Sequence, residues 1–338
     1  MTLTKIPMIH NLELISSVTP EFRYNGEKPF EVWQQEARAK LRELVCLDAI
    51  ERPKDNLFNL EYEKKCDGYT EYRFTLSSEV GYYFPCVLRI PDGVKAPIPT
   101  YICLQGHSTG MHMSLGIPKF PGDAEGLKGD RDFVVRANAE GYAAIAVEQR
   151  NFGECGSNPN DGDPQCHVAT MTNIINGRTT IGERIADISA LIDVIEEHFK
   201  QLDSENIVLM GHSGGGTATY YAACLEPRVK TAVASCAVCT YKDSIAAMHH
   251  CVCNFIPNIA KYFDMGDLGG LIAPRKLLVV NGAEDNIFPK NGVYESYDII
   301  KKMYAAAGAP DNCAHVEGNG GHRFYADPAW PVIHKFFK

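Results

Sequence analysis

The chain has 338 residues, of which 45% are hydrophobic and 22% are charged, and its formal net charge is −9. This length and composition suit one large α/β domain with additions, or two smaller domains, around a core of ordinary size. The acidic balance, with a pI near 5.7, argues against a nucleic-acid partner, because the chain has no excess of cations to neutralise phosphates.

We expect neither a signal peptide nor a membrane span in this sequence. Residues 1–22 contain no continuous apolar stretch with a small-residue cleavage site, and no later stretch approaches the roughly 18 apolar residues of a membrane span. We therefore expect a cytoplasmic location and no membrane partner. Many of the twelve cysteines stand in apolar runs, as Cys103 and Cys236 do. We expect them to be reduced and to pack as small hydrophobes.

A helix and three strands are predicted before residue 100. Residues 30–47 predict an amphipathic helix, because their apolar side chains recur at helical spacing. This face comprises Phe30, Trp33, Ala37, Leu41, Leu44 and Val45. We expect a helical extension over residues 1–55 and a catalytic domain over residues 56–338. Runs at 56–66, 69–78 and 81–90 predict antiparallel strands that lead into this domain.

From residue 100 onward, predicted strands and helices alternate. The strands lie within residues 100–106, 142–153, 206–211, 229–238, 276–282 and 312–318. The helices lie within residues 131–141, 180–199, 215–226 and 294–307, with a further helix at the C-terminus. Continuous apolar strands that alternate with helices predict an α/β fold with a mostly parallel central sheet and helices on both faces.

The turn after the strand at 206–211 carries a possible nucleophile. Residues 211–215, Gly-His-Ser-Gly-Gly, match G-x-S-x-G between a predicted strand and a predicted helix. Flanking glycines let such a turn tighten, so that the serine hydroxyl of Ser213 rises above the sheet edge. The alternative is a sharp turn with a bystander serine. His212 is expected to pack beneath the turn, because its ring cannot easily reach the adjacent hydroxyl.

An acidic residue and a histidine follow the last two predicted strands. Ligands of a parallel sheet bind beyond the carboxyl ends of its strands, and Asp285 and His322 both fall at such ends. Their order along the chain after the serine is that of hydrolases with a Ser-Asp-His triad. Glu284 stays open as an alternative acid, and His315 as an alternative base, although His315 falls inside the strand.

Two backbone N–H groups must stabilise the oxyanion that forms in such a reaction. We expect one from Gly214, which follows the candidate nucleophile, and the other from His107, in the loop after the strand at 100–106. The alternative for His107 is an ordinary loop residue. Arg150 could hold a substrate carboxylate, but an ion pair with a carboxylate such as Asp187 is the preferred interpretation.

A cluster of cysteine and histidine residues lies between residues 236 and 253. It contains Cys236-x-x-Cys239 and His249-His250-Cys251-x-Cys253. A zinc site is imaginable, but Cys236 falls in a predicted strand and the second half lacks zinc-ribbon spacing. We expect core cysteines here, with no metal and no cofactor. The segments 153–171 and 241–267 are expected to shape the pocket.

Between about residues 83 and 337, the sequence resembles the α/β-hydrolase fold family, in the branch of acetylxylan esterases and dienelactone-hydrolase-like proteins (abhydrolase family 7-like). The segments that carry the resemblance are LQGH (104–107), VEQRNFGECG (147–156), GRTTIGERIADISALIDVI (177–195), GHSGGG (211–216), DLGGLIAPRKLLVVNGAEDNIFP (267–289) and GGHRF (320–324). The resemblance implies an α/β-hydrolase fold, a triad of Ser213, Asp285 and His322, and oxyanion donors at His107 and Gly214. Dienelactone hydrolases use a cysteine nucleophile, so the serine favours ordinary ester hydrolysis.

The function predicted from the sequence is that of a serine esterase acting on a small-molecule ester. The resemblance alone suggests short-acyl substrates such as acetylated sugars. A peptidase or amidase of the prolyl-oligopeptidase type is an alternative, although no propeller-like repeats precede the domain. A non-catalytic binding protein on the same fold is another. A homo-oligomer is possible on the sequence alone.

Overall fold

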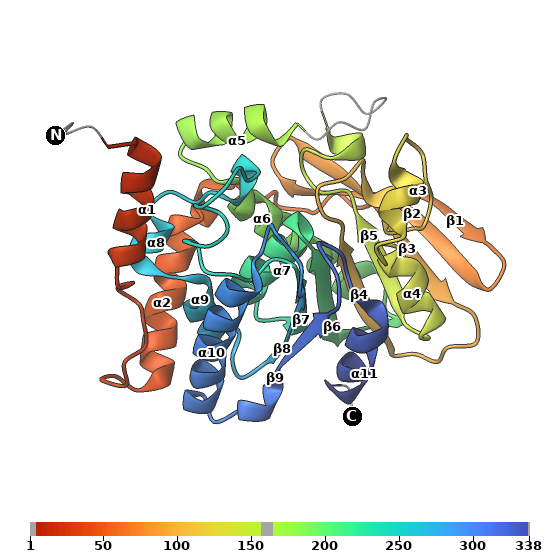
Figure 1. Cartoon of the computed structure of the whole chain (residues 1–338). Coiled ribbons are helices and arrows are strands. Elements are labelled where there is room, and N and C mark those ends of the chain that lie inside the picture. The colour runs from red at the N-terminus through yellow and green to blue at the C-terminus, as the bar shows by residue number, and fades with distance from the viewer. Residues whose placement is uncertain (1–4, 157–164, 337–338) are drawn as a thin grey trace.

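The structure is a computed structural model that describes residues 5–156 and 165–336 (Figure 1). Its centre is a nine-stranded sheet with the order β1-β2-β3-β5-β4-β6-β7-β8-β9. The strands are β1 (Asn59–Lys65), β2 (Tyr69–Glu79), β3 (Tyr82–Pro91), β4 (Ile98–Leu104), β5 (Ala143–Val147), β6 (Leu202–His212), β7 (Val229–Ser235), β8 (Lys276–Gly282) and β9 (Cys313–Gly318). β1, β2 and β3 pair antiparallel, β3 pairs antiparallel with β5, and all pairs from β5 to β9 are parallel. The mixed sheet predicted from the sequence is therefore confirmed.

Helices cover both faces of this sheet. They are α1 (Pro7–Ser17), α2 (Phe30–Leu44), α3 (Asp123–Leu127), α4 (Phe133–Ala139), α5 (Cys166–Ile175), α6 (Thr180–His198), α7 (Gly214–Leu225), α8 (Ile259–Tyr262), α9 (Met265–Ile272), α10 (Lys290–Ala306) and α11 (Ala326–Phe336). No helix in the described part of the chain combines the length and apolarity needed to cross a bilayer.

The alternation of side chains along the strands divides the core into two layers. Ile207 and Leu209 of β6 pack with α2, α6, α7, α9 and α10 in the larger layer. Their neighbours Val208 and Met210 face the opposite way and pack with α4 and α11. Because successive strand residues point to opposite faces, a sheet buried on both sides needs apolar residues at successive positions, as β6 has from Ile207 to Met210.

The N-terminal helix α2 belongs to the larger of these layers. Trp33 and Ala37 are buried in it, and the Gln34 side-chain amide donates to the carbonyl oxygens of Gly270 on α9 and of Ala273, which follows α9. Figure 1 shows α1 and α2 on one side of the molecule, and β1 on the opposite side. The boundary at residue 55 stays a prediction, although α2 and the catalytic part of the chain share one core.

Several short helices were not predicted from the sequence. They are α1, α3, α5, α8 and α9, of which α8 and α9 lie between the predicted strands at 229–238 and 276–282. The predicted pocket-shaping segment 153–171 is described only in part, because residues 157–164 lie outside the described residues. Its second half contains the start of α5.

Candidate active site

Ser213 occupies a sharp turn between β6 and α7. β6 ends at His212, α7 begins at Gly214, and Ser213 between them has φ 55° and ψ −121°. This conformation costs a non-glycine residue about 1–3 kcal/mol and is typical of functional turns. A Cβ atom at Gly215 would overlap the carbonyl oxygens of Leu104 and Gln105. The absence of a side chain at Gly215 therefore lets α7 start close against β4. The hydroxyl of Ser213, the residue before α7, forms no hydrogen bond with the first backbone N–H groups of that helix.

Asp285 and His322 form a hydrogen-bonded pair beyond the ends of β8 and β9. His322 Nδ1 and Asp285 Oδ2 are 2.8 Å apart. The backbone N–H groups of Ile287 and Phe288 donate to Asp285 Oδ1 at 2.8 and 3.1 Å. Burial alone would raise the pKa of Asp285, but the hydrogen bond and charge of His322 and the two N–H groups hold it below its ordinary value. Asp285 is therefore an anion that can orient an imidazole ring.

Glu284 and His315, the alternative acid and base, are placed differently from Asp285 and His322. Glu284 is exposed, whereas its neighbour Asp285 is buried. His315 lies on β9, with Nε2 2.5 Å from Asn281 Oδ1. His212 is buried, as expected, and its Nδ1 lies 3.1 Å from Ser235 Oγ. Burial lowers the pKa of His212 well below its ordinary value, so this ring is a neutral packing group.

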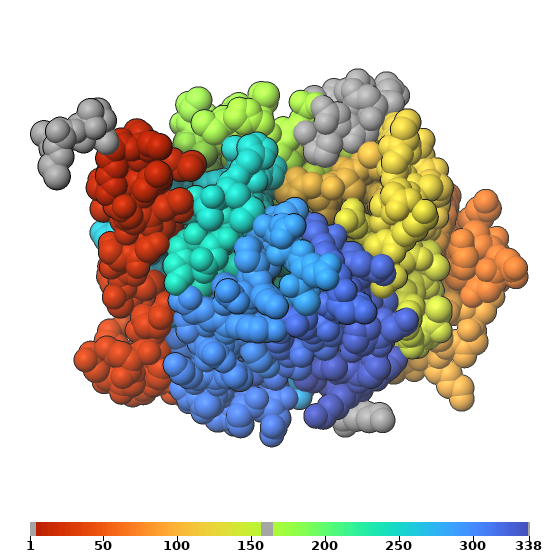
Figure 2. All heavy atoms as spheres, viewed as in Figure 1, coloured from red at the N-terminus to blue at the C-terminus, as the bar shows by residue number. Residues whose placement is uncertain are grey.

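Ser213 and His322 line the same pocket, which has a volume of about 270 Å³. The other lining residues are Gly106, His107, Arg131, His212, His249, His250, Cys251 and Ile287. The residues of the loop 241–267 among them agree with the expectation that this loop shapes the pocket. Figure 2 shows this segment on the surface, between the N-terminal helices and α10. Arg131 was not singled out from the sequence, because a lone arginine before a helix carries no pattern.

The loop after β4 lies against the serine turn. A Cβ atom at Gly106 would fall 3.1 Å from Ser213 Cβ, and one at Gly214 would fall 2.6 Å from His107 Cε1. The N–H of Gly214 points out of the first turn of α7, where backbone N–H groups have no intrahelical partner. The N–H of His107 donates to no backbone carbonyl of the described residues. The loop that carries His107 thus lies against Ser213 and Gly214, and the role of the two N–H groups stays a prediction.

The predicted pairing of Arg150 with Asp187 is confirmed. Arg150 Nε and Nη2 donate to the Asp187 carboxylate at 3.0 Å, and Nη1 donates to Glu79 at 3.0 Å. The guanidinium also lies 3.8 Å from the centre of the Tyr82 ring. Arg150 is buried and does not line the pocket of Ser213, so its ion pairs fix the loop after β5.

A buried carboxyl group supports the loop after β4. Glu148 accepts hydrogen bonds from Gln105 Nε2 at 3.2 Å and from the N–H groups of Met111 and Glu154 at 3.0 and 3.2 Å. Burial raises the pKa of Glu148 to about 8, against the lowering effect of the two N–H groups. The group is therefore mostly protonated at neutral pH.

Two groups of side chains bring possible metal ligands within 4.8 Å of one another among the described residues. One consists of Cys236 with Asp285 and His322, and so includes the acid–histidine pair itself. The other consists of His107, Cys166, Cys251 and Cys253. The cysteine and histidine cluster expected between residues 236 and 253 thus divides in the fold. Cys236 lies beside Asp285, whereas Cys251 and Cys253 meet residues from two distant segments.

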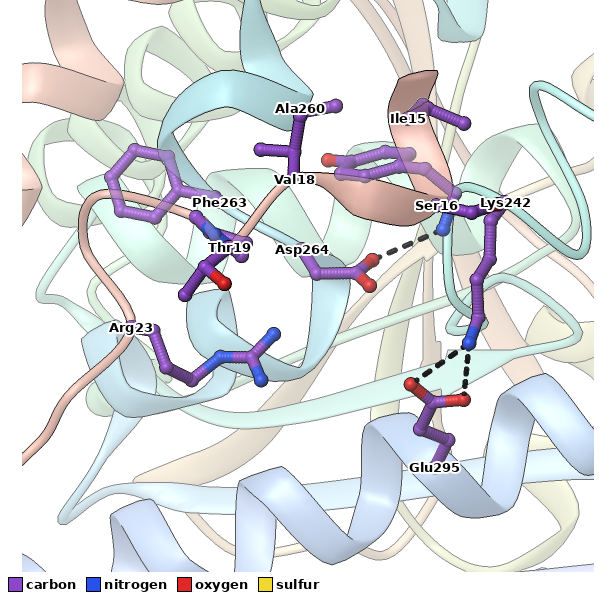
Figure 3. Close-up of a pocket in the computed structure, with 12 residues that line it drawn as sticks. Ile15, Ser16, Val18, Thr19, Arg23, Lys242, Ala260, Phe263, Asp264 and Glu295 are labelled. Carbon is purple, nitrogen blue, oxygen red and sulfur yellow. Dashed lines mark hydrogen bonds and ion pairs between the residues drawn. The ribbon is translucent and has the colours of Figure 1, made fainter. Parts of the chain in front are cut away.

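A second pocket, of about 140 Å³, lies beneath α1 (Figure 3). Lys242 and Glu295 form an ion pair there at 2.8 Å, and Asp264 accepts a hydrogen bond from the Tyr241 N–H at 3.0 Å. Arg23 also lines this pocket, and its guanidinium pairs with Asp267. These charged groups already have partners, and none resembles a nucleophile beside a base, so the pocket of Ser213 is the better candidate for catalysis.

Comparisons with known proteins agree with this fold. The profile described as "Abhydrolase family" matches residues 7–328. YtaP of Bacillus subtilis (strain 168), a protein provisionally named as a hydrolase, is 25% identical over 235 residues, which cover 69% of this chain and 75% of YtaP.

Two solved structures have the same architecture. A provisionally assigned acetyl xylan esterase from Bacteroides fragilis superimposes with a TM-score of 0.78 at 17% identity, over 93% of this chain and 83% of the esterase. A glucuronoyl esterase from Solibacter usitatus gives a TM-score of 0.68 at 15% identity, over 95% of this chain and 98% of that enzyme. Likeness at such identities concerns the fold, which is the α/β-hydrolase fold.

Proposed function

Since the chain belongs to the Abhydrolase family, we propose that it is a serine hydrolase that cleaves carboxylic esters with Ser213 as nucleophile. The observation that carries the proposal is the hydrogen-bonded pair of His322 and Asp285 at the pocket that Ser213 lines. A serine hydroxyl becomes reactive only when an oriented base takes its proton. The two residues can act as that base and its orienting acid.

The reaction proceeds in two steps. Ser213 Oγ attacks the ester carbonyl carbon while its proton passes to His322 Nε2, and the same proton then goes to the leaving alkoxide. Asp285 accepts from His322 Nδ1 and stabilises the imidazolium form. The N–H groups of His107 and Gly214 stabilise the oxyanion. Water, deprotonated by His322, then hydrolyses the acyl-enzyme and frees Ser213.

Short acyl groups, such as acetyl esters of carbohydrates, are the proposed substrates. The pocket volume of about 270 Å³ lies just below the ~300–1,000 Å³ of pockets that enclose drug-sized ligands. A short acyl group fits this space, while a sugar would extend from its mouth. The name of the Bacteroides fragilis neighbour, an acetyl xylan esterase, points to the same class.

The test compares wild-type protein with Ser213→Ala on p-nitrophenyl acetate, on acetylated xylo-oligosaccharides and with a fluorophosphonate probe. We expect turnover of the esters and labelling by the probe, with both lost in the variant while its circular dichroism stays unchanged. Glu284→Gln, a change at an exposed residue beside the acid, is the matched control and should keep both. Full labelling and turnover of Ser213→Ala would remove Ser213 from this role.

A further inference from the structure

Four side chains from three separate segments meet at the wall of the Ser213 pocket. His107 belongs to the loop after β4, Cys166 is the first residue of α5, and Cys251 and Cys253 lie at the short 3-10 helix Val252–Asn254. One ligand atom from each lies within 4.8 Å of all the others, and His107 Nε2 is 3.1 Å from Cys253 Sγ. All twelve cysteines, these three included, are free thiols in the structure.

We propose that His107, Cys166, Cys251 and Cys253 bind one Zn²⁺ ion in a closed tetrahedral site. Three thiolates and one imidazole are a ligand set that proteins use for structural zinc. Zinc–sulfur bonds of about 2.3 Å separate tetrahedral sulfur atoms by roughly 3.8 Å, so the four ligands need to approach one another by at most about an ångström. Two of the three cysteines and Arg184 beside them are buried, which excludes water from most of the site.

Arg184 gives an independent reason to expect a bound metal. Its side chain is 1% exposed, and its Nη1 and Nη2 atoms lie 3.8 Å from Cys253 Sγ and 3.9 Å from Cys166 Sγ. Its Nε has no partner among the described residues. The guanidinium forms no ion pair with a carboxylate of the described residues, although an unpaired buried charge is very costly.

The charge of the proposed site meets this requirement. Three thiolates and one Zn²⁺ ion carry a single net negative charge, which balances the single positive charge of Arg184. A disulfide with one thiolate would carry the same charge, and the mass map described below separates that state from the zinc site, whereas three neutral thiols would carry no charge. The zinc site thus compensates Arg184 while it also satisfies every sulfur atom.

A metal here would position the loop after β4 and would not itself react with substrate. All four coordination positions come from the protein, so no open position is left for water or an ester. The ring of His107 lies against Gly214, where a Cβ atom would fall 2.6 Å from it. Holding this ring in place also holds the His107 N–H beside Ser213. This effect on turnover rests on the proposed function, whereas metal binding itself does not.

Metal content is the direct test. Protein purified without chelators from zinc-supplemented medium should contain about one zinc ion per chain by elemental analysis. Cys166→Ser and Cys251→Ser should lose most of it, while Cys66→Ser, at a cysteine outside the cluster, should keep it. Ser213→Ala should also keep it, which separates this inference from the proposed function.

Two further measurements guard against variants that fail to fold. Cobalt(II) exchanged into wild-type protein should give thiolate-to-metal charge transfer and the d–d bands of tetrahedral coordination. A chelator should lower the melting temperature of wild-type protein, and added zinc should restore it. Any of three results would overturn the proposal. They are folded protein that stays free of zinc after exposure to zinc, stoichiometric iron or copper in place of zinc, and a disulfide among Cys166, Cys251 and Cys253 in a peptide mass map of the non-reduced protein.

Discussion

Replacing Asp285 with asparagine isolates the role of one oxygen atom. Asp285 Oδ1 accepts hydrogen bonds from the backbone N–H groups of Ile287 and Phe288, whereas Oδ2 lies 2.8 Å from His322 Nδ1. In Asp285→Asn, the amide oxygen can keep both backbone hydrogen bonds, and the NH₂ group replaces Oδ2. It then donates to His322 Nδ1, which moves the ring proton to Nε2. The nitrogen that should take the proton of Ser213 is therefore already protonated.

The expected loss is large in activity and small in stability. In Ser-His-Asp enzymes the wrong histidine tautomer lowers kcat roughly 10⁴-fold, which corresponds to about 5.4 kcal/mol of transition-state stabilisation. The KM should change little, because Asp285 does not line the pocket. Since the two backbone hydrogen bonds remain, the free energy of unfolding should fall by no more than about 1–3 kcal/mol.

The assay is steady-state hydrolysis of p-nitrophenyl acetate, with urea denaturation of the same samples. Glu284→Gln removes the neighbouring carboxylate and should leave kcat unchanged. If Asp285→Asn keeps a tenth or more of the wild-type kcat while the kcat of Glu284→Gln falls roughly 10⁴-fold, then Glu284 is the acid. The assignment of Asp285 from its contact with His322 would then be wrong. An equal loss in both variants would also contradict it.

Three further predictions concern the surroundings of the site. Arg150→Met should lower the free energy of unfolding in urea by about 3–5 kcal/mol, because it leaves the buried Asp187 carboxylate without its cation, whereas Glu79 and Glu183 keep Arg178. Folding raises the pKa of Glu148 to about 8 from a usual 4.5, so as the pH rises Glu148 loses its proton in the unfolded chain before it does so in the folded chain. The free energy of unfolding should therefore fall as pH rises from about 4.5 to 8, and fall less in Glu148→Gln, in urea titrations at several pH values. Gly214→Ala should lower kcat for p-nitrophenyl acetate by up to about 10²–10³-fold, because its methyl group displaces the His107 ring and the nearby N–H groups.

A specific result would contradict each of these three predictions. An unchanged urea midpoint in Arg150→Met would mean that its ion pairs add nothing to stability, and Arg42→Met, at an exposed ion pair, is the control. Parallel pH profiles for wild-type protein and Glu148→Gln would show that Glu148 is charged in the folded state. A Gly214→Ala variant with full kcat would remove His107 and the first turn of α7 from oxyanion stabilisation.

Most of the sheet and the relation among the candidate catalytic residues could be predicted because both follow from local patterns. Continuous apolar runs identify buried parallel strands, and the carboxyl ends of such strands share one edge of the sheet. Ser213, Asp285 and His322 each follow such a run. The sequence therefore indicated that these three residues share one edge of the sheet. The pairing of β8 with β9, which places Asp285 Oδ2 and His322 Nδ1 2.8 Å apart, follows from no local pattern.

The short helices escaped prediction for different physical reasons. α1 has no buried residue, and only Leu12 and Ile15 are half-buried, so little apolar area marks this helix in the sequence. α9 is buried all round and contains Gly269 and Gly270, residues that weaken a helical pattern. A Cβ atom at Gly270 would fall 2.6 Å from the Trp33 ring on α2, and one at Gly269 would fall 2.6 Å from Ile300 on α10. Tertiary packing therefore requires these glycines and overrides their low helix propensity.

The proposed zinc ligands could not be found from spacing. Only Cys251 and Cys253 are close in sequence, and their spacing matches no common zinc motif. His107 comes from the loop after β4, and Cys166 is the first residue of α5. The sequence-based expectation of no metal considered Cys236 and Cys239 as the partners. Cys239 instead donates to the Pro289 carbonyl oxygen, away from the other four residues.

The pairing of β8 with β9 has a consequence for how this protein can diverge. Gly282 and Gly318 stand opposite each other at the ends of these strands, so the loops that carry Asp285 and His322 start from a fixed relative position. The segment 241–267 supplies part of the pocket wall and adds no strand to the sheet. Substitutions in that wall, away from Cys251 and Cys253, can therefore change which ester is preferred, while the distance between the acid and the histidine stays the same.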